Sequence, residues 1–253
     1  MFSQEPRCIY RRNQLGEVIC QLRFPEILTI STTAPAEFQE AIRAEYPVYS
    51  ARKEPVMLKP GAPATQPGLN HQFATPDGVW RVNLTSKFIS LACSRYTRWE
   101  DFAAKLDKPL AAFIRIYRPA YFERVGLRYL NFISRGALEL NHIPFNQLLT
   151  SRYLGLLDDP EVNDATTLMN TVDADIAIKA GCRAKIHAGP GVIHRPGQTD
   201  KEPKFILDFD LYMPGKLALN LSAGALHTLH AQAYPLFRDA ITDTLHEAME
   251  PQF

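Results

Sequence analysis

The chain has 253 residues, of which 46% are hydrophobic and 22% are charged, so it is long and apolar enough to bury a large core and does not have a disordered composition. Its 28 basic and 27 acidic residues nearly cancel. This balance excludes a whole-molecule field that would attract nucleic acid or an anionic membrane.

The compartment is predicted from the cysteines and from the hydropathy pattern. No two cysteines form a Cys-x-x-Cys pair, and residues 1–10 carry acid, base and proline instead of the apolar core of a secretory leader. No later run approaches the roughly 20 apolar residues that cross a bilayer. We therefore expect a soluble, cytoplasmic protein without membrane association, in which four thiols are free and buried: Cys8, Cys20, Cys93 and Cys182.

The chain opens with a predicted strand and a short helix. Apolar and polar residues alternate from Glu17 to Phe24, as in a strand with one buried face. An amphipathic helix is predicted over 35–46, where Pro35 begins the first turn and Pro47 stops it. Prolines and glycines then mark a loop over 55–68.

A meander, a long helix and a long strand complete the first half. Apolar residues recur at a spacing of three to four over 98–117, which predicts a helix bent or divided at Pro109. Residues 122–134 have the pattern of a long strand. The antiparallel meander is predicted over the three segments 72–75, 79–84 and 88–93.

The second half repeats the mixture of strands and helices. A long C-terminal helix is predicted from Ser222, with apolar residues on one face as far as Ala248 and a kink at Pro235. We expect an α+β fold of two lobes, 1–135 and 136–253, packed together, each with antiparallel sheet backed by helices. The remaining elements of the second lobe are a short helix over 145–157 and strands near 168–179, 182–193 and 204–213.

Several motifs carry a family resemblance that covers nearly the whole chain. The chain resembles an uncharacterised, sporadically distributed bacterial family of chains of about this length. The resemblance implies a free-standing cytoplasmic α+β protein, and it brings no reaction, cofactor or catalytic residue. The motifs include Arg124-Val-Gly-Leu-Arg-Tyr-Leu-Asn131, Trp99-Glu-Asp-Phe102, Leu207-Asp-Phe-Asp210 and Leu236-Phe-Arg-Asp-Ala-Ile-Thr-Asp243.

Two arginines of the first motif form one candidate binding surface. On a regular strand Arg124 and Arg128 share a face with Gly126 between them, which leaves space above the sheet for a carboxylate or phosphate. The alternative is that both arginines pair with acids such as Glu17 and Glu123, with the glycine at a bulge. The candidate binding residues are Arg124, Arg128, Asn131, Lys185 and His187.

Two pairs of acids form a second candidate site. Each Asp-x-Asp pair places two carboxylates on one face of a strand, roughly 7 Å apart. If adjacent strands gather all four acids, they suit a hard cation such as Mg²⁺ or Mn²⁺, with Lys185 and His187 available for phosphate. Alternating acids are also typical of the wet face of an antiparallel sheet. The acids are Asp173 and Asp175 in one pair, and Asp208 and Asp210 in the other.

No catalytic signature accompanies these residues. His227 and His230 have a spacing that two metal ligands can use, but no acid or cysteine nearby completes a site. The stretch Gly189-Pro-Gly191 is a turn signal rather than a phosphate-binding loop. The chain contains no Gly-x-Ser-x-Gly elbow, His-Glu-x-x-His helix or dinucleotide motif.

Two functional interpretations follow. The first is a non-enzymatic interaction or accessory protein without a cofactor, such as an adaptor or an immunity-like partner of a co-encoded system. Its neutral charge and its lack of catalytic motifs favour a protein partner. The second is a metal-dependent or phosphate-handling enzyme that uses the two acid pairs. We prefer the first.

Overall fold

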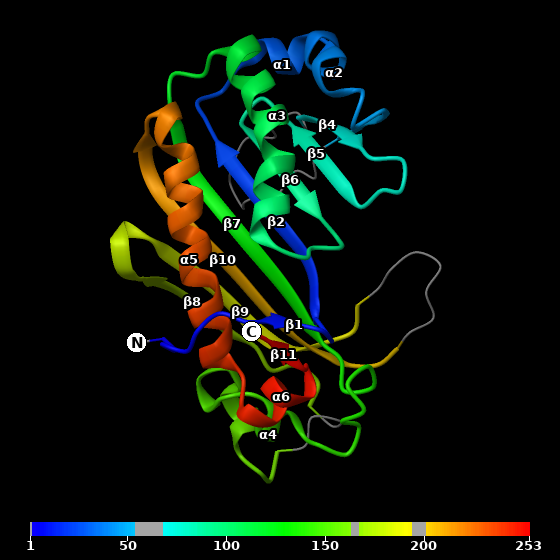
Figure 1. Ribbon diagram of the computed structural model, residues 1–253, viewed down its shortest axis with the longest axis vertical. Helices are drawn as coiled ribbons and strands as arrows, with labels where there is room; N and C mark the ends of the chain where they lie inside the picture. Colours follow the sequence, from blue (N-terminus) through cyan, green and yellow to red (C-terminus); the bar gives the residue numbers. More distant parts are fainter. Residues whose placement is uncertain (1, 54–67, 163–166, 194–200) are drawn as a thin grey trace, which may run out of the picture. The chain divides into compact units, whose positions relative to one another are not determined.

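The computed structural model describes residues 2–53, 68–162, 167–193 and 201–253 (Figure 1). It confirms the α+β fold, with antiparallel sheet in both of its compact units and a long helix near the C-terminus. The units are discontinuous in sequence: unit 1 is Met1–Glu17, Arg128–Tyr212 and His227–Phe253, and unit 2 is Val18–Leu127 and Met213–Leu226. The expected division into lobes 1–135 and 136–253 stays a prediction. The loop expected over 55–68 lies outside the described residues except for Gly68.

Unit 2 is built on a sheet that contains the predicted meander. Phe73, Val82 and Leu91 are paired across three of its neighbouring strands and are fully buried, so they define the face that packs into the core. The strand order is β3 (Val48–Lys53), β4 (Leu69–Ala74), β5 (Trp80–Leu84), β6 (Phe88–Cys93), β2 (Leu15–Arg23) and the first half of β7 (Phe122–Ile133).

Helix α3 (Trp99–Tyr117) lies over β6 in this unit (Figure 1). Its apolar stripe is buried as the spacing predicts, and Pro109 stands inside a helix that continues on both sides. The ring of Phe113 packs 4.6 Å from that of Phe24, between centroids. Two short helices precede α3, α1 (Leu28–Thr32) and α2 (Ala36–Ile42).

Unit 1 contains the remaining strands of this nine-stranded order. Its strand order is the second half of β7, then β10 (Lys204–Leu217, which continues into unit 2), β9 (Arg183–Gly191) and β8 (Val172–Ala177). Burial alternates in β10 from Lys204 to Leu211, with Asp208 and Asp210 on the face opposite to the buried residues Phe205, Leu207, Phe209 and Leu211. Gly189-Pro-Gly191, expected to turn, is the end of β9 and pairs with β10.

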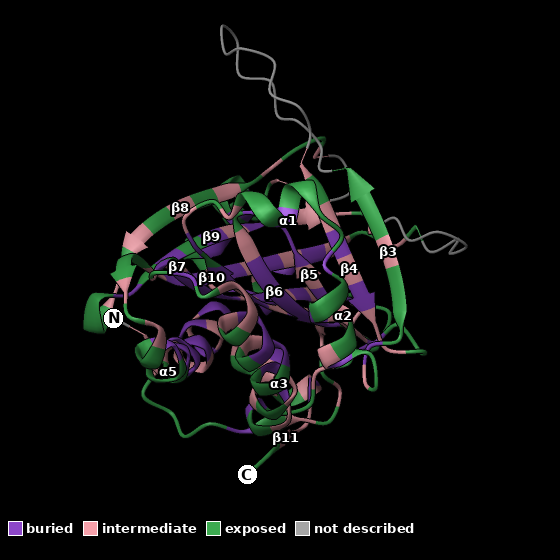
Figure 2. Ribbon diagram, turned by 90° about the horizontal axis from the view of Figure 1, so that it is seen from above, coloured by how far each residue is buried: buried purple, intermediate pink, exposed green. Residues whose placement is uncertain are grey.

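The buried face of this sheet packs on helix α5 (Ser222–Ala240), as Figure 2 shows. The Tyr129 hydroxyl lies 2.9 Å from Nδ1 of His230 on that helix, and both residues are buried. Pro235 stands within α5, as it does in the predicted helix.

The C-terminal helix is shorter than predicted. It ends at Ala240, and α6 (Asp243–Ala248) begins after two intervening residues, where the Thr242 hydroxyl accepts a hydrogen bond from the N–H of Leu245. Between the helices, Ile241 forms a β-bridge with Leu149. The apolar spacing continues through this break, which is why the sequence predicts one helix.

The remaining elements of unit 1 are short. The predicted helix over 145–157 is α4 (Phe145–Leu148) followed by two 3₁₀ turns, Ser151–Tyr153 and Gly155–Asp158. A separate two-stranded sheet joins β1 (Ile9–Tyr10) to β11 (Pro251–Gln252), which fastens the two ends of the described chain.

Two expectations about the whole chain can be compared with the structure. All four cysteines are free and buried, as predicted. Over the described ranges, no helix combines the length and the apolar character that a membrane crossing needs.

Candidate functional site

The predicted site residues of unit 1 lie in two rows across its exposed sheet face. In both rows a basic residue of β9 stands between two acids, because β8 and β10 each pair with β9 and not with each other. Neighbouring strands are about 4.8 Å apart, so the acids of β8 and β10 are separated by roughly 10 Å at the backbone. The expectation that adjacent strands gather the four acids is therefore wrong. The rows are Asp173, His187 and Asp208, and Asp175, Lys185 and Asp210.

Both carboxylates of the first acid pair, Asp173 and Asp175, are held by side chains of the protein. Nδ1 of His187 lies 2.8 Å from Oδ1 of Asp173. The Tyr212 hydroxyl is 3.0 Å from both carboxylate oxygens of Asp175, and the Lys185 ammonium lies 5.9 Å from the centroid of the same tyrosine ring. These contacts tie β8 to β9 and β10 across the exposed face.

Arg128 pairs with an acid of β10 on this face. Its Nε donates to Oδ1 of Asp208 at 2.7 Å and its Nη2 donates to Oδ2, so the contact is bidentate. These hydrogen bonds to Asp208 raise the pKa of the guanidinium, and the charges of Asp210 and Glu17 act in the same direction. The position at which we expect a ligand carboxylate or phosphate is thus occupied by a carboxylate of the protein.

The other two candidate binding residues of this strand, Arg124 and Asn131, are placed differently. The Arg124 guanidinium folds back over Gly126, and a Cβ on that glycine would collide with its Nη1. The space predicted above the glycine is therefore filled by Arg124 itself. Asn131 lies on the buried face, where its Nδ2 donates to the carbonyl of Leu207 at 3.1 Å. This bond joins β7 to β10.

The described residues do not bring three or more histidine, cysteine or acidic side chains together in an arrangement that would hold a metal ion. The two rows explain this, because the carboxylates of Asp173, Asp175 and Asp208 are partnered by an imidazole, a phenol and a guanidinium of the protein. A hard cation needs several oxygens converging on one point.

The structure also exposes three apolar side chains, on two segments that one asparagine joins, which the sequence does not predict. These side chains are strongly exposed, at 74% for Leu156, 103% for Leu168 and 85% for Met169. Asn170 joins the two segments, since its Oδ1 accepts from the N–H of Leu156 at 3.0 Å and its Nδ2 donates to the carbonyl of Leu154 at 2.8 Å. We call Leu156, Leu168 and Met169 the apolar cluster.

The apolar cluster is fastened to the sheet by a close backbone approach. The carbonyl oxygen of Asn170 lies where a Cβ on Gly189 would stand, and the Thr171 Cα would lie 3.3 Å from that Cβ. Only glycine therefore allows this segment to pack on β9. In the sequence, a glycine within a strand is the signal that could have indicated this contact. Because Gly189 stands next to Pro190, however, the sequence there is typical of a turn.

Exposed acids follow both segments of the apolar cluster. In Figure 2 strand β8 is coloured as exposed or intermediate along its length. The acids that follow Leu156 and Met169 in the chain are all exposed, and we call them the acidic rim: Asp158, Asp159, Glu161, Asp173 and Asp175.

Comparisons with known proteins give no assignment for this site. No model of a known protein family matches the chain, and no curated protein matches it. The resemblance to a sporadic bacterial family stays a proposal that rests on the quoted motifs.

Proposed function

We propose that the chain is a non-enzymatic interaction or accessory protein, an adaptor or an immunity-like partner of a co-encoded system, and that unit 1 binds a basic protein partner. The observation that carries this proposal is the apolar cluster. Leu156, Leu168 and Met169 are exposed, yet the hydrogen bonds of Asn170 hold their backbones together.

Exposed apolar side chains gathered in this way favour a protein interface. A single exposed leucine is ordinary on a protein surface, but a contiguous apolar patch rimmed by polar groups is typical of a binding site. Interfaces have an apolar centre and a polar rim, and methionine is enriched in them. In this proposal the apolar cluster is the centre of the interface, and the acidic rim, which follows it along the chain, is the surround.

The charge of the rim favours a basic partner. The five rim acids carry a formal charge of −5. His187 hydrogen-bonds to Asp173 and the Lys185 ammonium lies near Tyr212, but three of the acids, Asp158, Asp159 and Glu161, are exposed residues away from these contacts. Like charges along one rim attract a partner of opposite sign and repel nucleic acid. A protein with an apolar anchor beside lysines or arginines would fit both features.

The charged rows support this proposal more than the enzyme alternative. Arg128 binds Asp208, His187 binds Asp173 and Tyr212 binds Asp175, so these groups stabilise the sheet on which the apolar cluster is mounted. An anion that used Arg128 would have to displace Asp208, whose side chain is only 12% exposed. No observation in the described residues favours phosphoryl chemistry.

Site-specific photo-crosslinking tests the proposal. A photo-crosslinking amino acid is placed at position 168 in one version of the chain and at position 221 in another, where Leu221 is also exposed, at 54%, but lies in unit 2. Both are expressed in the native host. We expect a discrete adduct with one basic protein from position 168 only, and its yield should fall in the Met169→Ser background. The proposal is wrong if position 168 gives no adduct, or if both positions give the same adducts.

A further inference from the structure

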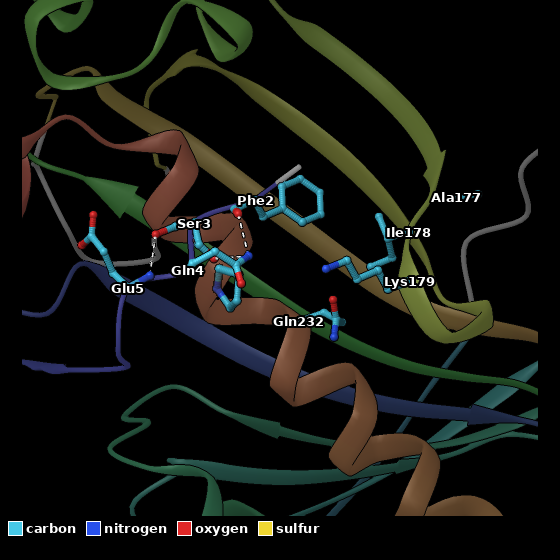
Figure 3. A pocket seen from close by; sticks show the side chains of 9 residues that line it. Phe2, Ser3, Gln4, Glu5, Ala177, Ile178, Lys179 and Gln232 are labelled. Carbon is cyan, nitrogen blue, oxygen red and sulfur yellow. Dashed lines mark hydrogen bonds between the residues drawn. The ribbon is translucent and has the colours of Figure 1, made fainter.

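A pocket of about 550 Å³ opens in unit 1 among three elements that are distant in sequence (Figure 3). The N-terminal segment supplies Phe2, the turn between β8 and β9 supplies Ile178 and Lys179, and α5 supplies Gln232 and Pro235. Its volume falls within the range typical of small-molecule sites, about 300 to 1,000 Å³.

An ion pair holds the N-terminal wall against the helix. Nε of Arg238 donates to Oε2 of Glu5 at 2.6 Å, and the Arg238 side chain is only 9% exposed. Within the wall, the N–H of Glu5 donates to Oγ of Ser3 at 3.2 Å, and Nε2 of Gln4 donates to the carbonyl of Phe2 at 3.1 Å. The segment that carries the Phe2 ring is therefore attached to α5.

The opposite wall is fixed by a tight turn. The N–H of Ile178 donates to the carbonyl of Cys182 at 2.9 Å, and the N–H of Cys182 donates to the carbonyl of Lys179 at 3.2 Å. Ala180 and Gly181 adopt left-handed conformations, with φ of 59° and 72°. The buried Cys182 anchors the turn and leaves Lys179 at the pocket.

Two polar groups converge on the apolar interior. Within the described part of the chain, neither the Lys179 ammonium nor the Gln232 side-chain amide makes a hydrogen bond or ion pair. Figure 3 shows both facing the space beside the Phe2 ring. The site therefore offers one positive charge and one amide next to the apolar surfaces of Phe2, Ile178 and Pro235. The Glu5 carboxylate also lines the pocket, but it is paired with Arg238.

We propose that this pocket binds a small organic monocarboxylate with an apolar body. The carboxylate would accept from the Lys179 ammonium and the Gln232 amide, and the apolar body would lie against Phe2, Ile178 and Pro235. A phosphate fits less well, because tight phosphate sites in proteins use arginine forks or several backbone N–H groups. Here the nearby Arg238 is already bound to Glu5.

Calorimetric titration with 3-phenylpropionate tests this inference on the full chain. The neutral 3-phenylpropionamide has the same body without the charge, and inorganic phosphate has charge without the body. The variants are Lys179→Ala, Lys179→Arg, and Lys201→Ala as a control, since Lys201 is an exposed lysine of the same unit that does not line the pocket. Circular dichroism verifies that each variant is folded.

We expect saturable binding of 3-phenylpropionate, and binding at least tenfold weaker for Lys179→Ala and for the neutral amide. Lys179→Arg and Lys201→Ala should bind within about threefold of the wild type. The inference is overturned if 3-phenylpropionate does not saturate, if Lys179→Ala binds like the wild type, or if phosphate binds as tightly as the aromatic acid. Because the pocket and the apolar cluster share no residue, this result is independent of partner binding.

Discussion

The Arg128 guanidinium and the Asp208 carboxylate form a bidentate pair between β7 and β10. One residue comes from the predicted anion-binding motif and the other from a predicted metal-binding pair. The guanidinium and the carboxylate neutralise and hydrogen-bond each other, so both motifs contribute to holding the sheet of unit 1 together. The pair is asymmetric, because the side chain of Arg128 is 44% exposed and that of Asp208 only 12%.

This difference in exposure predicts the effect of removing the Arg128 guanidinium on stability. Arg128→Ala should lower the free energy of unfolding by about 1 to 3 kcal/mol, since it leaves a nearly buried carboxylate without its partner. Arg98→Ala is the control, because Arg98 and Asp101 are 59% and 46% exposed, and the loss of stability there should be much smaller. Urea unfolding measures the free energy of unfolding of both variants. Equal losses of stability in the two variants would contradict a structural role for the Arg128–Asp208 pair.

Two glycines of β9 provide a matched test of the backbone contact beneath the apolar cluster. Gly189→Ala should destabilise the chain by about 1 to 3 kcal/mol, because the new Cβ would collide with the Asn170 carbonyl. In Gly191→Ala the Cβ would meet only the end of the Ile206 side chain, at 2.8 Å, which can rotate away. Thermal melts of both variants should show the larger decrease in melting temperature for Gly189→Ala. The reverse order would mean that Asn170 does not pack on β9 in this way.

A buried histidine in unit 2 predicts a pH dependence of stability. His71 lies between two partners: the Tyr49 hydroxyl donates to its Nδ1 at 3.0 Å, and its Nε2 donates to the carbonyl of Ile30 at 3.3 Å. Desolvation by burial lowers its pKa below the ordinary value of 6.5, although the bond to Ile30 acts in the opposite direction. Burial therefore favours the neutral form of His71 in the folded chain.

The direction of this pH dependence follows from how many protons the folded and unfolded chains bind at His71. Between the lowered pKa and 6.5 the unfolded chain binds more protons at this residue than the folded chain. The contribution of His71 to stability is present above pH 6.5 and is lost as the pH falls through the folded pKa. Urea unfolding at pH 7.5 and at pH 5 should show a smaller drop for His71→Gln than for the wild type, and an unchanged drop would contradict this assignment.

Local patterns in the sequence predict the elements whose apolar spacing is strong. Alternation identifies β2 and β7, and the spacing of Trp99, Phe102 and Leu106 identifies α3. Strand β3 is missed because nearly all of its residues are exposed, so no alternation marks it. Helix α1 is missed because it has five residues and a single buried one, Ile30.

The candidate site is predicted only in part, because strand order is not a local property. The sequence places Asp173 and Asp208 on strands correctly, but it contains no signal that β9 lies between them. Hydrogen bonding across β9 decides that these acids meet His187 and not each other. The apolar cluster is missed for the same reason, since Leu156 and Leu168 are joined only through Asn170.

The arrangement of the acids predicts no response to divalent cations. Mg²⁺ or Mn²⁺ should leave the melting temperature of the wild type unchanged, because the carboxylates are spread over two rows and bind side chains of the protein. The double variant Asp208→Asn with Asp210→Asn is the control. If the cation raises the melting temperature of the wild type but not that of the double variant, the metal-site interpretation would be restored.

The most direct test of the central claim is the affinity of the crosslinked partner, once purified, for variants of the apolar cluster. The double variant Leu168→Ser with Met169→Ser should bind at least about tenfold more weakly than the wild type, since buried apolar anchors dominate interface energies. Leu221→Ser should bind like the wild type, and raising the salt from about 0.05 M to 0.5 M should weaken binding to the acidic rim. Wild-type affinity in the double variant, with no dependence on salt, would contradict the proposal that unit 1 binds a basic partner here.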